Sequence, residues 1–156
     1  MRKMIFIHVL TVALGLCLVL VSLLFTGFTQ GERMARTALS YMGAPYVLGR
    51  RGPDQFDCSG LILFCADKEG VTGLPHAAKE LYELGRFVPR WALLPGDMVC
   101  FDTVRDDDAC DHVGIYLGGN RFVHASSAKK QIVISELTDY YAEKYSGARR
   151  LASPYI

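Results

Sequence analysis

The order of the structural signals along the chain is the feature that most restricts its fold. After Pro95-Gly96 the chain carries four short runs rich in β-branched and aromatic residues, at 97–101, 112–117, 121–125 and 131–135. Gly118-Gly119-Asn120 marks a tight turn between the second and third runs. No helical pattern separates these runs, so they predict an antiparallel meander rather than the parallel sheet of an α/β protein.

Most of the helical signals come before this meander. The predicted helices are, in order, 32–42, 58–69, 76–84 and 139–145, and a terminal strand is predicted at 148–151. The second helix is rich in apolar residues, has Asp57 at its N-cap position and is ended by Gly70. Three helices followed by consecutive strands predict an α+β fold class in one domain.

The N-terminal segment has a different composition from the rest of the chain. Arg2 and Lys3 precede the stretch from Met4 to Gln30, which contains no Lys, Arg, Asp or Glu, and 20 of the first 28 residues are apolar. This pattern predicts an export signal in residues 1–31, either cleaved or retained as a membrane anchor. The body, residues 32–156, is then expected outside the cytoplasm, in the periplasm or cell envelope.

Charge and cysteine content narrow the class of protein further. Residues 32–156 carry 15 basic and 16 acidic side chains, which argues against a nucleic-acid binder driven by charge. No cysteine pair has the Cys-x-x-Cys spacing of a zinc site, so no structural metal is indicated. If Cys58 stays free, then Cys65, Cys100 and Cys110 allow at most one disulfide in an oxidising compartment. Cys65 fits a small core residue, and the sequence does not decide the redox state of Cys110.

Cys58 and two histidines form a candidate reactive group. A helix N-terminus favours a thiolate, so the position of Cys58 predicts a thiol pKa lowered to roughly 3.5 to 7.5 with help from an imidazole. Position alone fits a buried structural cysteine equally well. His112 and His124 lie on consecutive predicted strands and share a sheet face, where one imidazole can accept the thiol proton and the other can orient it.

Several motifs around these residues resemble a known family. They are Gly43-Ala-Pro-Tyr46, Phe56-Asp-Cys-Ser-Gly-Leu61, Leu74-Pro75, Leu94-Pro-Gly-Asp-Met-Val99, His112-Val-Gly-Ile-Tyr-Leu-Gly118, Arg121-Phe-Val-His-Ala125 and Ala148-Arg-Arg150. In order and spacing they are similar to those of the NlpC/P60 cysteine peptidases of bacterial cell walls, over residues 32 to 152. The resemblance implies a reduced papain-like fold, with the cysteine helix packed on an antiparallel sheet.

The resemblance also implies a role for each matching residue. It makes Cys58 the nucleophile, His112 the general base and His124 the residue that orients His112. Tyr46 falls where a tyrosine lies beside the nucleophile and supports the oxyanion, although a packing aromatic fits this position nearly as well. The backbone N–H of Cys58, at a helix start, is a natural oxyanion donor.

The positions flanking the nucleophile are implied to bind substrate. Asp57 and Ser59 would contact the amine end of the stem peptide, and for Asp57 a plain helix cap is an alternative that does not exclude this contact. Leu48 stands where tryptophan is frequent in the family and His76 where arginine is usual. The details of substrate binding therefore stay open.

The resulting functional hypothesis is a peptidoglycan hydrolase. It is expected to cleave stem peptides, in this family commonly between D-γ-glutamate and diaminopimelate, as a monomer without a cofactor, a metal or nucleic acid. Contact with the membrane would come through the N-terminal segment if it is not cleaved. The alternatives are an N-acetylmuramoyl-L-alanine amidase or an acyl transferase on the same Cys/His site, or a non-catalytic wall-binding module.

Overall fold

A computed structural model of the chain describes residues 27–104 and 109–151. The export signal or anchor expected in residues 1–31 therefore lies almost entirely outside the described residues. Within the described ranges, no helix is long and apolar enough to cross a membrane. The helices are α2 (Gln30–Leu39), α3 (Cys58–Lys68), α4 (Ala78–Glu83) and α5 (Asp139–Lys144), with a 3-10 turn η1 (Arg90–Ala92).

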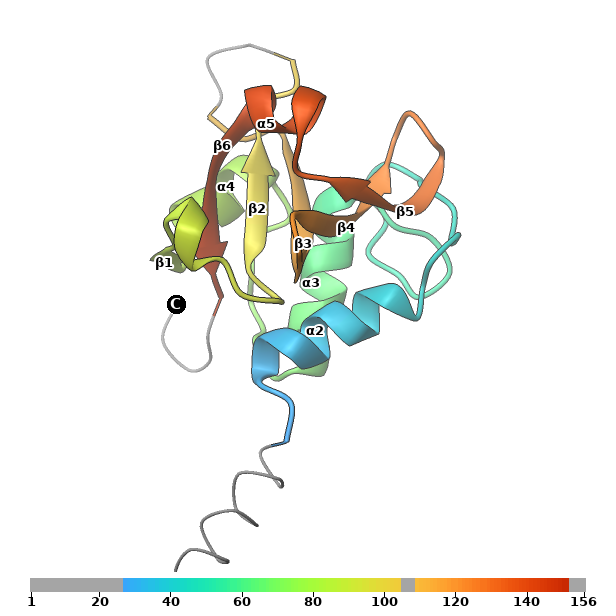
Figure 1. The fold of residues 1–156 in the computed structure, drawn as a ribbon. Coiled ribbons are helices and arrows are strands. Elements are labelled where there is room, and N and C mark those ends of the chain that lie inside the picture. The colour runs from blue at the N-terminus through green and yellow to red at the C-terminus, as the bar shows by residue number, and fades with distance from the viewer. Residues whose placement is uncertain (1–26, 105–108, 152–156) are drawn as a thin grey trace, which may run out of the picture.

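A six-stranded antiparallel sheet forms the centre of the fold (Figure 1). Its strands are β1 (Arg86–Phe87), β2 (Met98–Phe101), β3 (His112–Gly118), β4 (Arg121–Ser126), β5 (Gln131–Glu136) and β6 (Tyr145–Arg150), in the spatial order β1-β6-β2-β3-β4-β5. The predicted meander corresponds to β2–β5, and the predicted α+β class is confirmed. The turn between β3 and β4 contains Asn120 with φ 56, a conformation that asparagine tolerates better than most residues.

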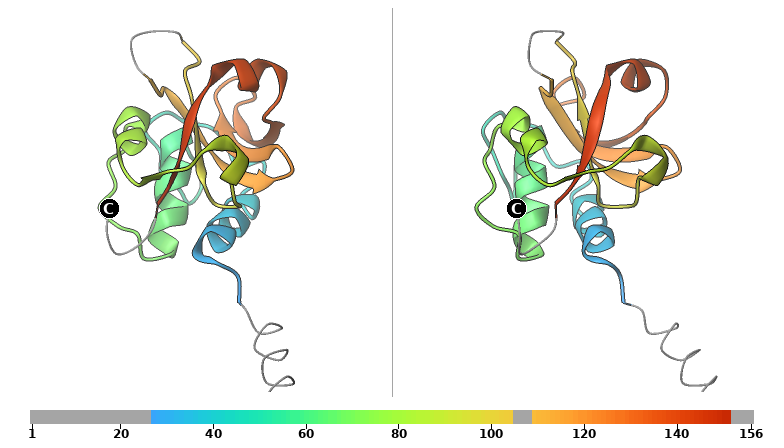
Figure 2. Two further views of the ribbon diagram at one scale, coloured as in Figure 1. Left: turned by 60° about the vertical axis from the view of Figure 1, so that its left-hand side comes forward. Right: turned by 90° about the vertical axis from the view of Figure 1, so that its left-hand side faces the viewer.

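Both faces of the sheet are covered, and the strands alternate their side chains between the two sides. The face toward α2 and α3 buries Met98, Cys100, Val113, Ile115 and Val123. The opposite face buries Val99, Phe101, Tyr116 and Phe122 beneath η1 and α5. Figure 2 shows α3 (green) and α5 (red) on opposite sides of the strands. Cys65 lies fully buried on the α3 side, as predicted.

Helix α2 begins and ends earlier than the sequence pattern predicts. Thr29 and Glu32 form a capping box, in which the Glu32 N–H donates to Thr29 Oγ1 (3.2 Å) and the Thr29 N–H donates to Glu32 Oε2 (2.7 Å). The helix ends at Leu39, and the Gly43 N–H instead donates to the carbonyl of Ile132 on β5 (3.0 Å). Pairing with the sheet edge thus replaces the last turn of the expected helix.

Two short elements near the other edge of the sheet, β1 and η1, were not predicted, whereas β6 corresponds to the predicted terminal strand. β1 has two residues and η1 has three, lengths at which side-chain periodicity carries almost no signal. β6 begins at Tyr145, three residues before the predicted strand. It is held to the start of β2 by Arg150, which donates to both carboxylate oxygens of the buried Asp97 at 2.6 and 2.7 Å.

Candidate active site

Cys58 is the first residue of α3, and the preceding residue fixes the start of that helix. The Asp57 Oδ1 atom accepts hydrogen bonds from the Gly60 N–H (2.6 Å) and the Ser59 hydroxyl (3.2 Å). The Asp57 Oδ2 atom accepts from the Gly49 N–H (2.6 Å), which ties the preceding loop to the helix. Asp57 is therefore the N-cap, as predicted, and it also organises the loop beside Cys58.

Gly60 lets that loop lie directly against the helix. A Cβ atom at this position would stand 2.1 Å from the carbonyl oxygen of Arg50, well inside van der Waals contact. Only glycine fits this approach without a backbone shift, so the motif after Cys58 sets the distance between loop and helix.

The Cys58 side chain points toward the beginning of β3. Its thiol interacts with the backbone N–H groups of Val113 and Ser59, and Val113 directly follows His112. Burial raises the thiol pKa to about 11, because it outweighs these backbone groups. The expected lowering of the Cys58 pKa is therefore wrong: the helix N-terminus is present, but desolvation dominates.

His112 and His124 meet on one face of the sheet. His112 Nε2 lies 2.7 Å from His124 Nδ1, and the two rings are nearly perpendicular. The expected proximity of the two imidazoles is confirmed. Burial lowers the pKa of His112 to about 4 and that of His124 to about 3, so both rings are neutral near pH 7.

Ser135 and Tyr141 extend this histidine pair, and the sequence analysis missed them. His124 Nε2 lies 3.0 Å from Ser135 Oγ, and the Ser135 hydroxyl is hydrogen bonded to Tyr141. One arrangement of protons satisfies this series of hydrogen bonds. The His112 Nε2–H donates to His124 Nδ1, and the His124 Nε2–H donates to Ser135 Oγ. This leaves His112 Nδ1 as a free acceptor. Period-two alternation could have identified Ser135, because it shares a β5 face with Val133, the cross-strand partner of His124.

A cleft of about 300 Å³ opens over the start of α3. It is lined by Leu48, Gly49, Asp57, Cys58, Ser59, His76, Ala77, Ala78 and Asp111. His76 Nε2 lies 3.0 Å from Asp57 Oδ1, so it occupies the cleft wall beside the cap. Ser59 is buried with its hydroxyl already bonded to Asp57. Tyr46 is half-buried near Cys58, and burial together with Cys58 and Asp57 raises its pKa.

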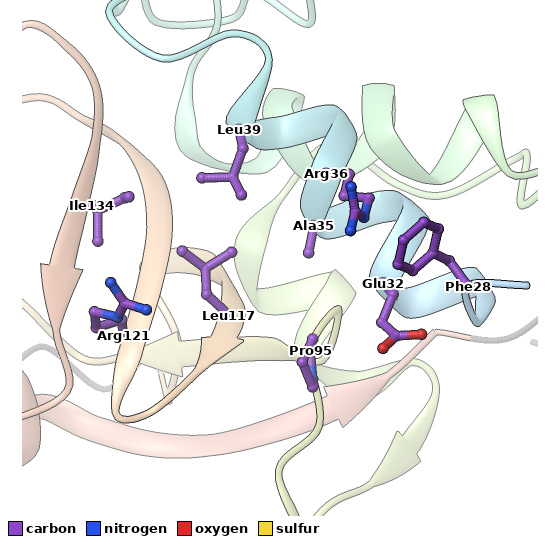
Figure 3. Close-up of a pocket in the computed structure, with 9 residues that line it drawn as sticks. All are labelled: Phe28, Glu32, Ala35, Arg36, Leu39, Pro95, Leu117, Arg121 and Ile134. Carbon is purple, nitrogen blue, oxygen red and sulfur yellow. The ribbon is translucent and has the colours of Figure 1, made fainter. Parts of the chain in front are cut away.

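A larger pocket of about 400 Å³ lies elsewhere, between α2 and the strands β3–β5 (Figure 3). Its lining residues are Phe28, Glu32, Ala35, Arg36, Leu39, Pro95, Leu117, Arg121 and Ile134. Because these described residues include neither a cysteine nor a histidine, the pocket is separate from the thiol–imidazole group. The smaller cleft is the candidate active site.

Burial of the two neutral histidines predicts an acid-sensitive fold. The unfolded chain binds protons on both rings below pH 6.5, whereas the folded chain resists protonation until about pH 4 for His112 and about pH 3 for His124. The free energy of unfolding should thus fall as pH drops from 6.5 to 5, by up to about 1.4 kcal/mol per pH unit for each histidine. Urea unfolding across this range measures the slope, and His124→Asn should roughly halve it. An unchanged slope in His124→Asn would contradict the buried neutral ring.

Comparison with known proteins places this site in a family. The NlpC/P60 family model matches residues 43–150. A γ-DL-glutamyl hydrolase of Bacillus subtilis is 36% identical over 124 residues, which cover 78% of this chain and 30% of that protein. A murein DD-endopeptidase and LD-carboxypeptidase of Escherichia coli, MepS, is 36% identical over 113 residues, 72% of this chain and 58% of that protein.

The fold comparison agrees. A crystal structure of a lipoprotein-like NLP/P60 protein from Staphylococcus aureus matches with a TM-score of 0.71 and 35% identity, over 83% of this chain and 44% of that one. The chain spans between 30% and 58% of the length of the two enzymes named above. The match of the family model covers the cysteine helix and both histidine strands. The chain belongs to the NlpC/P60 family.

Proposed function

We propose that this chain is a cysteine peptidase that cleaves the stem peptides of peptidoglycan. The observation that carries the proposal is the thiol of Cys58, which faces the start of β3 where His112 is hydrogen bonded to His124. The relatives are named as hydrolases and endopeptidases, which supports the same chemistry. Cys58 would be the nucleophile, His112 the general base and His124 the residue that orients it.

The proposed reaction starts from a neutral thiol and a neutral imidazole. As Cys58 Sγ attacks the carbonyl carbon, His112 Nδ1 takes the thiol proton and the carbonyl oxygen becomes an oxyanion. The Cys58 N–H, which the helix ladder leaves free, and the Tyr46 hydroxyl would stabilise that charge. His112 then protonates the leaving amine, and a water molecule, deprotonated by the same imidazole, hydrolyses the thioester.

For the scissile bond we propose the D-γ-glutamyl–diaminopimelate amide. The named γ-glutamyl activity of the Bacillus subtilis relative supports it, whereas the DD-endopeptidase name of MepS favours the peptide cross-link as a second candidate. The Asp57 carboxylate and the Ser59 hydroxyl at the cleft would receive the amine end of the substrate.

Mass spectrometry of fragments released from purified sacculi distinguishes these reactions. Cleavage of the γ-glutamyl bond frees fragments whose new amino terminus is diaminopimelate, and cleavage of the cross-link separates dimers into monomers. An amidase would instead release whole stem peptides that begin with L-alanine. Release of whole stem peptides, or of nothing, would contradict the proposal.

We also propose that residues 1–31 direct export and are not cut within or directly after Thr29-Gln30-Gly31. Thr29 caps α2, Arg33 donates to the Phe28 carbonyl (2.6 Å), and the Arg36 guanidinium lies 3.6 Å from the centre of the Phe28 ring. A cut there would remove these contacts. The intact mass of the protein recovered from cells and culture medium together tests this, because a mature chain starting at Gln30, Gly31 or Glu32 would contradict it.

Removal of the Ser135 hydroxyl is predicted to reduce turnover. In Ser135→Ala the His124 Nε2–H loses its acceptor, so the His112 tautomer with a free Nδ1 is no longer favoured. We expect kcat to fall about tenfold with KM unchanged, which corresponds to one lost hydrogen bond in the transition state. Ser135→Thr retains the hydroxyl and should keep most of the activity. If Ser135→Ala and the wild type had equal kcat, the result would contradict a role for the Ser135 hydroxyl in orienting the two histidines.

A further inference from the structure

Two buried cysteines outside the proposed machinery lie beside the nucleophile. Cys100 is on β2 and Cys110 lies two residues before His112, and both are fully buried within the cluster that α3 covers. The Cys110 thiol is 3.6 Å from the carbonyl oxygen of His112. Their two side chains also contact each other through a hydrogen bond.

The strand pairing explains why these sulfur atoms converge. Cys100 is the cross-strand partner of Val113, so its side chain points toward the α3 side of the sheet. The Asp111 N–H donates to the Phe101 carbonyl (3.0 Å), which extends the β2–β3 ladder by one residue. Beyond it the chain leaves the regular strand, and the Cys110 side chain turns back toward the His112 carbonyl and contacts Cys100.

Cys110 is also within electrostatic range of Cys58, whose thiol contacts the backbone of Val113. Cys110 therefore neighbours both Cys100 and the nucleophile. In an oxidising compartment this arrangement is a hazard, because a free Cys110 could form a disulfide with Cys58. Capture of Cys110 by Cys100 would remove that hazard.

We propose that Cys100 and Cys110 form a disulfide, and that this bond keeps Cys58 free as a thiol. The inference goes beyond the proposed function and shares with it only the export of the chain. The oxidant is a disulfide, carried by a small molecule or by a thiol oxidoreductase. One cysteine thiolate attacks it and releases a thiol, and the second thiolate then attacks the mixed disulfide and releases the other. Two protons and two electrons leave the chain, and the exchange takes place during folding, before both sulfur atoms are buried.

Thiol mapping of the full-length chain tests the proposal without reference to enzyme activity. The chain, solubilised in detergent, is unfolded and reduced, then refolded with oxidised and reduced glutathione. It is next unfolded again in urea without reductant in the presence of the alkylating reagent, so that every free thiol is reached, and digested with trypsin. Cleavage after Arg105 separates the two cysteines into different peptides. The expected result is a linked Cys100–Cys110 peptide pair, with Cys58 and Cys65 alkylated.

Variants then test the protective role. In Cys100→Ser, Cys110 should form a disulfide with Cys58, so Cys58 should no longer be alkylated. Reduction with dithiothreitol should restore the alkylation of Cys58. The double variant with Cys100→Ser and Cys110→Ser should keep Cys58 free, and the control Cys65→Ser should still link Cys100 to Cys110. Full alkylation of Cys100 and Cys110 in the wild type would overturn the proposal. The proposal would also be overturned if Cys58 were alkylated to the same extent in Cys100→Ser as in the double variant.

Discussion

Replacing Cys58 with alanine is expected to abolish peptidoglycan hydrolysis while leaving the fold intact. The substitution removes the only atom that can attack the substrate in the proposed reaction, so activity should fall by at least about 10⁴-fold. Alanine is a good helix former, and the Asp57 cap does not involve the thiol. The free energy of unfolding should therefore change by no more than about 1 kcal/mol.

Cys65→Ala is the matched control for this variant. Cys65 lies two turns further along the same helix and is fully buried among apolar side chains. Its removal should cost about 1 kcal/mol of stability through a small cavity but leave hydrolysis intact. Loss of activity in Cys65→Ala, or retained activity in Cys58→Ala, would contradict the assignment of the nucleophile. Fragment release from sacculi and urea unfolding give the two readouts.

Asp57→Ala is expected to be the most destabilising single substitution near the site. The carboxylate is buried and accepts hydrogen bonds from Gly49, Ser59 and Gly60, besides its contact with His76. Alanine leaves these groups without their acceptor and removes the helix cap, which should cost about 3 to 5 kcal/mol. Urea unfolding measures the cost, and hydrolysis should fall as well because the loop and His76 lose their anchor.

Two further variants isolate the role of the carboxylate. Asp54→Ala removes an exposed carboxylate from the same loop and should change stability by less than about 0.5 kcal/mol. Asp57→Asn keeps an oxygen able to cap the helix, so its loss of stability should be much smaller than that of alanine. If Asp57→Ala unfolded at the same urea concentration as Asp54→Ala, the carboxylate would not organise the cleft.

The central part of this fold could be predicted from the sequence because its signals are local. The strands β2–β5 follow runs of β-branched and aromatic residues, and the turn at Gly118-Gly119-Asn120 fixes the β3–β4 hairpin. Once that hairpin is known, the alternation of a strand brings His112 and His124 to one face. The contact between their rings follows directly from these two observations.

The remainder depends on contacts between distant segments, which one sequence does not reveal. The pKa of Cys58 was predicted in the wrong direction because the sequence shows a helix start but not how deeply packing buries the thiol. Two of the four partners of Asp57, Gly49 eight residues earlier and His76 nineteen residues later, are distant in sequence, and only folding brings them to the carboxylate. Likewise, the contact between Cys100 and Cys110 depends on the pairing of β2 with β3.

Capture of the covalent intermediate tests the central claim most directly. The full-length enzyme is mixed with purified stem-peptide fragments, quenched in acid within one turnover, and digested for mass spectrometry. We predict a thioester adduct on the peptide that contains Cys58, with the mass of the substrate portion on the carbonyl side of the cut bond. The adduct should be absent in Cys58→Ala and should accumulate in Ser135→Ala if deacylation also needs the oriented His112. Hydrolysis with no adduct on Cys58, and at the wild-type rate in Cys58→Ala, would contradict the proposed mechanism.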